Sequence, residues 1–143
     1  MVLSRRDAFS SLAVLLELAA SSAQAQTGPA APPRPPVFKH DLPNLTMDGW
    51  EVTVSYVDYP PARVGQPHRH PGFVLAYVLE GSVIAKIVGE GISDEERTYR
   101  AGEMFYEPPG ATHQVSRNAS STEPARLLAM IFALKGLPQT SPA

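Results

Sequence analysis

Two histidines separated by one residue are the strongest chemical signal in this chain of 143 residues. His68 and His70 lie in a turn-rich segment, and residues i and i+2 of an extended segment point to the same face, about 6.5–7 Å apart. Two imidazole nitrogens at that distance can converge on one metal ion with bonds of about 2.0–2.1 Å. The pair therefore predicts part of a metal site, which needs at least one further ligand.

His113 is the candidate for that third ligand. It follows the turn-forming residues 108–112, and several strand-like segments separate it from the first pair. The chain has four histidines and no cysteine, so a metal would be held by imidazole, carboxylate, water or substrate and not by thiolate. The remaining histidine, His40, has no partner at ligand spacing, and we expect it at the surface.

The residues around the histidine pair resemble the first motif of the cupin family. That motif is a glycine, five residues, His-x-His, three or four residues, a glutamate, six residues and a glycine. His68 and His70 supply the pair, and Gly81 stands at the closing glycine. Two positions depart from the pattern: Val74 stands where the glutamate is expected, and Gly65 is nearer to the pair than the pattern asks.

The second cupin motif is a glycine, five residues, Pro-x-Gly, two residues, a histidine, three residues and an asparagine. The chain matches it in register at Gly102, Pro108, Gly110 and His113. Arg117 stands at the asparagine position, and Asn118 follows one place late. The resemblance covers roughly residues 50–134 and implies an all-β fold, a cupin-type jelly-roll barrel of antiparallel strands.

Short strands with frequent turns agree with a jelly roll. Residues 50–56 alternate with period two and have one apolar face, Trp50, Val52, Val54 and Tyr56. Residues 73–79 are apolar on both faces, with Val74, Ala76 and Val78 expected inward and the outer face covered by a second sheet or a second subunit. Residues 82–88 are expected to return as a hairpin after Glu80-Gly81. Strand parity predicts that Ser116 faces away from His113.

The N-terminal residues have the pattern of an export signal. Arg5 and Arg6 precede a short apolar run, and a small-x-small site ends at Ala25. This pattern predicts a twin-arginine-like signal peptide, with an ordinary Sec signal as the alternative, and a periplasmic or secreted bacterial protein. The expected organisation is a signal peptide over 1–25, a Pro-rich linker and lead-in over 26–45, a cupin barrel over 46–135 and a tail over 136–143.

Composition narrows the partners. The formal net charge is −2 and no basic block is present, so we expect no nucleic acid as a partner, and no membrane association after signal cleavage. Hydrophobic residues make up 43% of the chain, enough for one core. The apolar outer face of residues 73–79 suggests a homodimer, and a small molecule is the expected ligand or substrate.

Three imidazoles without a carboxylate would leave a divalent ion its full double charge, which favours anionic, chelating substrates. Resemblance to cupin dioxygenases implies a three-histidine mononuclear Fe(II) dioxygenase, although Mn, Ni, Cu, Co and Zn also accept imidazole. A cupin that binds a metal or small ligand without turnover is the alternative, and a metal-free sugar-binding or isomerase cupin is a third. Glu107 is either a hydrogen-bond partner of a ligand histidine or a rim residue exposed to water.

Overall fold

The barrel consists of antiparallel strands whose positions follow the alternation of apolar residues. The structure is a computed structural model that describes residues 32–143, so the expected signal peptide lies outside the described residues. The strands are β1 (Trp50–Tyr59), β2 (His68–Arg69), β3 (Phe73–Glu80), β4 (Ser82–Val88), β5 (Arg97–Arg100), β6 (Met104–Glu107), β7 (Thr112–Asn118), β8 (Ala125–Leu134) and β9 (Ser141–Pro142). Residues 32–143 contain no helix, and hence none that could cross a membrane.

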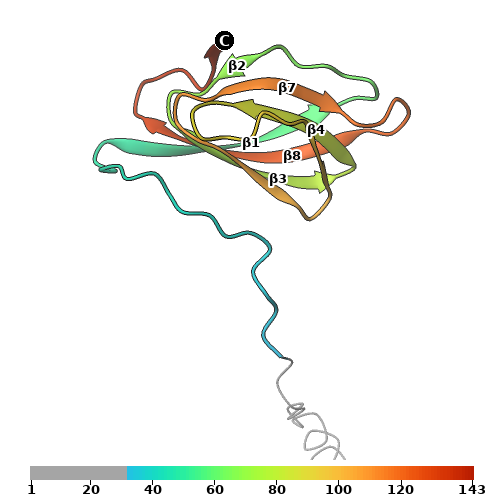
Figure 1. Ribbon diagram of the computed structural model, residues 1–143, viewed down its shortest axis with the longest axis horizontal. Helices are drawn as coiled ribbons and strands as arrows, with labels where there is room; N and C mark the ends of the chain where they lie inside the picture. Colours follow the sequence, from blue (N-terminus) through green and yellow to red (C-terminus); the bar gives the residue numbers. More distant parts are fainter. Residues whose placement is uncertain (1–31) are drawn as a thin grey trace, which may run out of the picture. The chain divides into compact units, whose positions relative to one another are not determined.

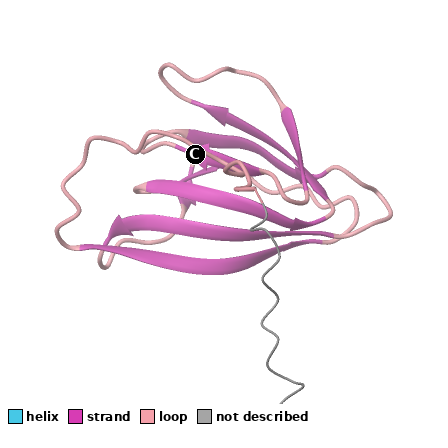
Figure 2. Cartoon of the chain, turned by 90° about the horizontal axis from the view of Figure 1, so that it is seen from below, coloured by secondary structure: helices cyan, strands magenta, loops and turns pink. Residues whose placement is uncertain are grey.

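The strands form two sheets that face each other. One sheet has the order β1-β8-β3-β6 and the other has the order β5-β4-β7-β2-β9, with all pairs antiparallel. Figures 1 and 2 show the two layers, with the connecting loops at their ends. This arrangement confirms the all-β jelly roll, since a core between two sheets needs one apolar residue in two from each strand.

The core lies between the sheets, where the inner faces of the central strands meet. Val74, Ala76 and Val78 of β3 point inward as expected and are at most 2% exposed. The cluster around them is continuous across both sheets and consists of Tyr59, Ala76, Val78, Val83, Ala85, Phe105, Ala125 and Leu127. Four residues of this cluster, Tyr59, Ala76, Phe105 and Leu127, also line a cavity in the barrel interior.

The expected hairpin of residues 73–88 does not form. β3 and β4 belong to different sheets, and the Glu80–Gly81 turn carries the chain from one layer to the other. Gly81 has φ of 67°, and a Cβ atom there would lie 2.5 Å from the carbonyl oxygen of Pro124. Glycine therefore allows a sharp corner between layers here, a possibility that the local pattern does not separate from a hairpin turn.

The apolar face of β1 points outward. Val52, Val54 and Tyr56 are 49%, 55% and 68% exposed, whereas Ser55 and Val57 on the opposite face line the interior. In the ladder these three residues lie beside Phe132, Met130 and Leu128 of β8, and that row continues into Phe73, Leu75 and Tyr77 of β3. We call this set of nine side chains the outer apolar face.

A β-bulge in β7 changes which side chains point inward. In the ladder of β4 and β7, Lys86 pairs with Val115 and Ile87 with His113, so Gln114 has no partner and is exposed. His113 and Ser116 are 3% and 4% exposed, on the same side of the sheet. The expectation that Ser116 faces away from His113 was therefore wrong, because one extra residue reverses the alternation.

The same bulge explains the late asparagine of the second motif. Asn118 is 5% exposed, and its amide nitrogen lies 2.9 Å from the carbonyl oxygen of Tyr59 and 2.8 Å from that of Glu123. Its side-chain oxygen accepts a hydrogen bond from the backbone of Ser120 at 2.8 Å. The extra residue at Gln114 thus restores the inward direction of an asparagine that ties two loops together.

Residues 35–143 form one compact unit, and its C-terminal end is more ordered than a tail. Gly136 turns the chain after β8 with φ of 82°. Ser141 and Pro142 then pair with Arg69 and His68 as β9, at the edge of the second sheet.

Candidate metal centre

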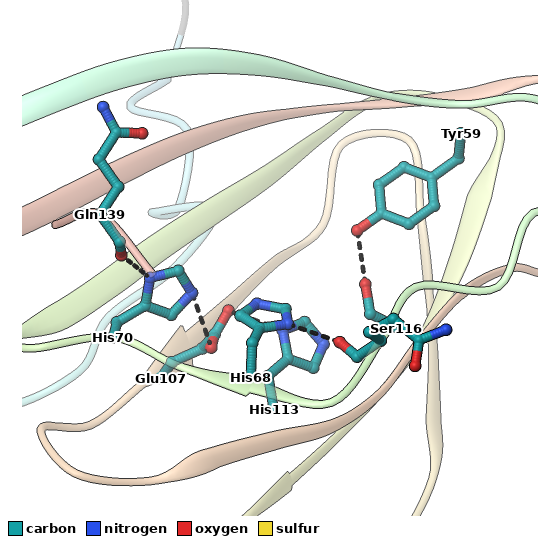
Figure 3. Close-up of polar contacts among 8 residues, drawn as sticks. Tyr59, His68, His70, Glu107, His113, Ser116 and Gln139 are labelled. Atoms are coloured by element: carbon teal, nitrogen blue, oxygen red, sulfur yellow. Dashed lines mark hydrogen bonds and ion pairs between the residues drawn. The ribbon is translucent and has the colours of Figure 1, made fainter. Parts of the chain in front are cut away.

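Three histidines and one glutamate from different strands meet at one end of the barrel. His68 of β2 lies directly opposite His113 of β7 in the ladder, and the centres of their rings are 5.0 Å apart. The rings of His68 and His70 are also 5.0 Å apart. Glu107 ends β6 in the opposite sheet and completes the group, as Figure 3 shows. The structure therefore brings together the three imidazoles that the sequence singled out.

Backbone carbonyl groups orient the first two rings. Nδ1 of His68 lies 2.9 Å from the carbonyl oxygen of Gln66, and Nδ1 of His70 lies 2.7 Å from that of Gln139. A carbonyl oxygen only accepts hydrogen bonds, so each Nδ1 carries a proton. When such a ring is neutral, its Nε2 atom has a free lone pair, which is the form that a metal ion binds.

Glu107 orients the third ring. Its Oε1 atom lies 3.1 Å from Nδ1 of His113, and both side chains are buried, at 6% and 4% exposed. Nε2 of His113 is buried without a hydrogen-bond partner within residues 32–143. A buried nitrogen without a partner lowers the stability of the folded state, and a ligand bound to this atom would remove that cost.

The other carboxylate oxygen faces a second lone pair. Oε2 of Glu107 lies 3.6 Å from Nε2 of His70, whose proton is held at Nδ1 by the carbonyl group of Gln139. Two electron-rich atoms face each other there, an arrangement that a cation between them would stabilise. His68, His70 and Glu107 each offer a ligand atom, and these atoms lie within 4.8 Å of one another. The donor set therefore fits a divalent transition metal.

Glu107 is buried, so it is not the water-exposed rim residue that the sequence left open. It lies directly opposite Val74 in the ladder of β3 and β6, the position where the first motif has its glutamate. Opposite residues of an antiparallel pair point to the same face, with Cβ atoms about 4.5–5.5 Å apart. The carboxylate is thus present at the cluster, supplied by the neighbouring strand. The sequence already offered Glu107 as a partner of a ligand histidine, and the strand register adds that it lies beside Val74.

The cluster shifts the protonation of its members. Burial lowers the pKa of His70 below its ordinary 6.5, because the charged ring loses its hydration, and the nearby carboxylate only partly offsets this. Burial by itself would raise the pKa of Glu107, but the hydrogen bond from His113 and the positive charge of the histidines bring it below its ordinary 4.5. At neutral pH the cluster therefore offers a neutral His70 and an ionised carboxylate.

A cavity of about 350 Å³ leads to this cluster. Its wall is largely apolar, with Val57, Ala76, Phe105, Leu127, Ala129 and Ile131 among the lining residues. The hydroxyl groups of Tyr59 and Ser116 also line it and lie 2.7 Å apart, and the guanidinium group of Arg63 lies 4.8 Å from the centre of the Tyr59 ring. The cavity thus has an apolar wall, the imidazole and carboxylate groups of the cluster and a polar pair; Figure 3 shows the cluster and the polar pair.

Two further polar residues, His40 and Glu103, lie outside the cluster. His40 is exposed, as expected, and its ring lies 4.3 Å from that of Tyr106. Glu103 accepts a hydrogen bond from the backbone of Arg100 in the turn before β6. Ser116 and Gln139 were not expected at the cavity, since a bulge moves the first and a long-range strand pair brings the second.

Comparison with known proteins agrees with the observed fold. The family model described as "Cupin domain" matches residues 55–131. A germin-like protein, 5-1, of Oryza sativa subsp. japonica is 30% identical over 96 residues, which are 66% of this chain. The chain spans only 42% of the length of that relative.

Two solved structures share the fold. An oxalate oxidase in complex with the substrate analogue glycolate superposes with a TM-score of 0.53 at 23% identity, covering 85% of this chain and 73% of that one. An oxalate decarboxylase of Lactobacillus farciminis in a formate complex has a TM-score of 0.53 at 15% identity, covering 64% of this chain and 26% of that one.

Proposed function

The chain belongs to the cupin domain family, and on that premise we propose that it holds one divalent metal ion at this cluster and presents it to a small anionic molecule. The observation that carries the proposal is the contact between His70 and Glu107, whose lone pairs face each other across 3.6 Å inside the protein. A cation shared between buried groups in such an arrangement would stabilise them, and His68, His70 and Glu107 offer ligand atoms that lie within 4.8 Å of one another.

The proposed ligands are His68, His70 and His113 through Nε2, and Glu107 through a carboxylate oxygen. The three rings are neutral when they bind, so one carboxylate would reduce the double positive charge to a single one. This differs from the three-histidine site with no carboxylate that the sequence suggested. A carboxylate still leaves the site positive, and a small anion would be attracted to it.

Fe(II) is the favoured ion, on the resemblance to cupin dioxygenases. Mn, Ni, Cu, Co and Zn are alternatives, because imidazole and carboxylate ligands suit all of them. When bound, such an ion supplies Lewis acidity, and an iron ion also supplies one-electron redox chemistry. The residues of the chain do the rest: the apolar wall excludes water, and the carbonyl groups of Gln66 and Gln139 fix the rings of His68 and His70.

The cavity limits the size and polarity of the substrate. A cavity of about 350 Å³ is near the lower end of the usual range for ligand sites, about 300–1,000 Å³. One hydrogen bond between the hydroxyls of Tyr59 and Ser116 uses one of their two protons, so the pair can donate the other to a substrate oxygen. The proposed substrate class is therefore small carboxylates that chelate a metal, and oxalate and glycolate are the first probes.

The proposal is tested by metal analysis of the full chain and of single alanine variants. We expect one ion per chain in the wild type and a loss of affinity of at least tenfold in His68→Ala, His70→Ala and His113→Ala. His40→Ala is the matched control, since this exposed histidine lies outside the cluster and its variant should keep wild-type affinity. Unchanged metal content in all three cluster variants would refute the metal site.

Turnover separates the two main functional classes. A dioxygenase should consume oxygen when loaded with Fe(II) and given a chelating carboxylate, and this uptake should vanish in His113→Ala. A non-catalytic cupin should bind the metal and the carboxylate, seen by calorimetry, without consuming oxygen. A metal-free cupin would show no rise in melting temperature on addition of any of the six metals, because only a ligand that binds the folded state stabilises it.

The setting of the protein is also proposed. Residues 1–25 would direct export to the bacterial periplasm or outside the cell, through the twin-arginine pathway by preference. The barrel would then work as a homodimer joined through the outer apolar face, whose Val54 and Tyr56 are 55% and 68% exposed in one chain. Apolar patches of this extent on a sheet commonly mark interaction surfaces.

A further inference from the structure

The C-terminal segment reaches the cluster from a distant part of the sequence. Gln139 lies 69 residues after His70, yet its carbonyl oxygen is 2.7 Å from Nδ1 of that ring. We propose that residues 139–142 form a strap that positions His70 as a metal ligand through the main-chain carbonyl group of Gln139. The inference rests on the proposed function in so far as it treats His70 as a metal ligand. The positioning of the His70 ring can be tested without metal.

The hydrogen bond determines which nitrogen of His70 is available. The carbonyl oxygen accepts the proton at Nδ1, so Nε2 is left unprotonated and faces Oε2 of Glu107. Without this acceptor, the neutral ring would be more stable with its proton at Nε2, from which it could donate a hydrogen bond to the carboxylate of Glu107. That tautomer would block both ligand atoms, and the strap therefore keeps them free.

The strap is held in place by a short strand pair. Ser141 and Pro142 of β9 lie opposite Arg69 and His68 of β2, at the outer edge of the sheet. Gln139 and Thr140 precede this strand and line the cavity. The strap is thus tied to the segment that carries the histidine pair, and it closes one side of the cavity.

The other ring of the pair provides an internal comparison. His68 has the same kind of contact, but its acceptor is the carbonyl group of Gln66, two residues away in the same loop. His68 therefore does not depend on the C-terminal segment for its orientation, whereas His70 does. His68 therefore serves as an internal control, because a change in the C-terminal segment should affect the His70 ring and not the His68 ring.

The strand pair with β2 is by itself a weak attachment for the strap. Ser141 and Pro142 are exposed, and their strand is only two residues long. A pair of this length buries little apolar surface, and such edges open most easily. The place of the strap at the cluster therefore depends on its pairing with β2 and on the hydrogen bond to His70.

Deletion of residues 139–143 from the full chain tests the strap by metal affinity. We expect affinity for Zn(II) and Fe(II), measured by competition with a chelator, to fall by about 10–100-fold, as for other groups that orient a ligand histidine. Gln139→Ala is the matched control, because it keeps the carbonyl group, and its affinity should stay within twofold of wild type. Melting curves would check that the shortened chain is folded. Wild-type affinity in a folded deletion variant would overturn the proposal.

Nitrogen NMR of the metal-free protein shows which ring nitrogen of His70 carries the proton, and so tests the positioning directly. In the full chain above pH 7, both His68 and His70 should carry their proton at Nδ1. In the deletion variant, His70 should shift toward protonation at Nε2 while His68 stays unchanged. A full chain with His70 protonated at Nε2, or a deletion that leaves its tautomer unchanged, would refute the strap. If the full chain binds no metal but shows the expected tautomers, the proposed function fails and the strap stands.

Discussion

Val74 and Glu107 lie directly opposite each other in the ladder of β3 and β6, with both side chains facing the barrel interior. The first cupin motif has a glutamate at the position of Val74, so this chain carries its carboxylate on the partner strand. Opposite positions of an antiparallel pair are close enough for either one to reach the same centre. The relationship explains how a carboxylate reaches the cluster although the first motif lacks one.

Exchange of these two residues gives the first prediction. Glu107→Val should lower metal affinity by at least tenfold, because it removes a donor and the acceptor for His113. Adding Val74→Glu to that variant should restore part of the lost affinity, since the carboxylate returns to the other side of the pair. Chelator competition measures both. A double variant no better than Glu107→Val would mean that the position of the carboxylate, and not only its presence, is required.

The pH dependence of stability is the second prediction. The pKa of Glu107 is below 4.5 in the fold, so its contribution to stability is present above pH 4.5 and is lost as the pH falls through the lower folded value. The pKa of His70 is below 6.5, so the unfolded chain binds the proton first, and stability falls as the pH drops below 6.5. Both groups make acid destabilising.

Melting temperatures of the metal-free protein between pH 8 and pH 4 check this prediction. They should decline from about pH 6.5 downward, and His70→Gln should flatten the part of the decline that lies above pH 5. A melting temperature that rises on acidification over this interval would contradict the sign of both shifts. Metal affinity should also decrease below about pH 6.5, because protons compete for the imidazoles.

Asn118 gives a third prediction, which concerns stability alone. Its side chain is 5% exposed and joins the carbonyl groups of Tyr59 and Glu123 to the backbone of Ser120. Asn118→Ala should cost about 2–4 kcal/mol of unfolding free energy, because it leaves several buried polar groups without partners. Urea unfolding measures this. The exposed Ser121→Ala in the same loop should change stability by less than about 0.5 kcal/mol.

The outer apolar face gives the fourth prediction. Val54 on the edge strand β1 is 55% exposed and begins a row that continues through Met130 into Leu75. If this face joins two copies, the wild type should sediment as a dimer and Val54→Lys as a monomer, because a buried ammonium group would lack a partner. Glu95→Lys, in the loop between β4 and β5, should leave the dimer intact. A wild type that is monomeric at 100 µM would count against the homodimer.

Local pattern and the resemblance to the two cupin motifs were together sufficient to predict the fold class and part of the candidate site. Alternating apolar residues located most strands, because side-chain direction along a strand repeats every two residues. The same rule placed His68 and His70 on one face, and the resemblance to the second cupin motif added His113. These features depend on neighbours in the sequence, so one sequence was enough to predict them.

Tertiary structure decided the rest, since it depends on which strands lie side by side. The register of β3 and β6 puts Glu107 beside Val74, and the bulge at Gln114 turns Ser116 and Asn118 inward. The pairing of β9 with β2 brings the carbonyl group of Gln139 to His70. Strand registers, bulges and edge pairs are set by packing between distant segments of the chain. A period-two pattern of apolar residues therefore does not predict them.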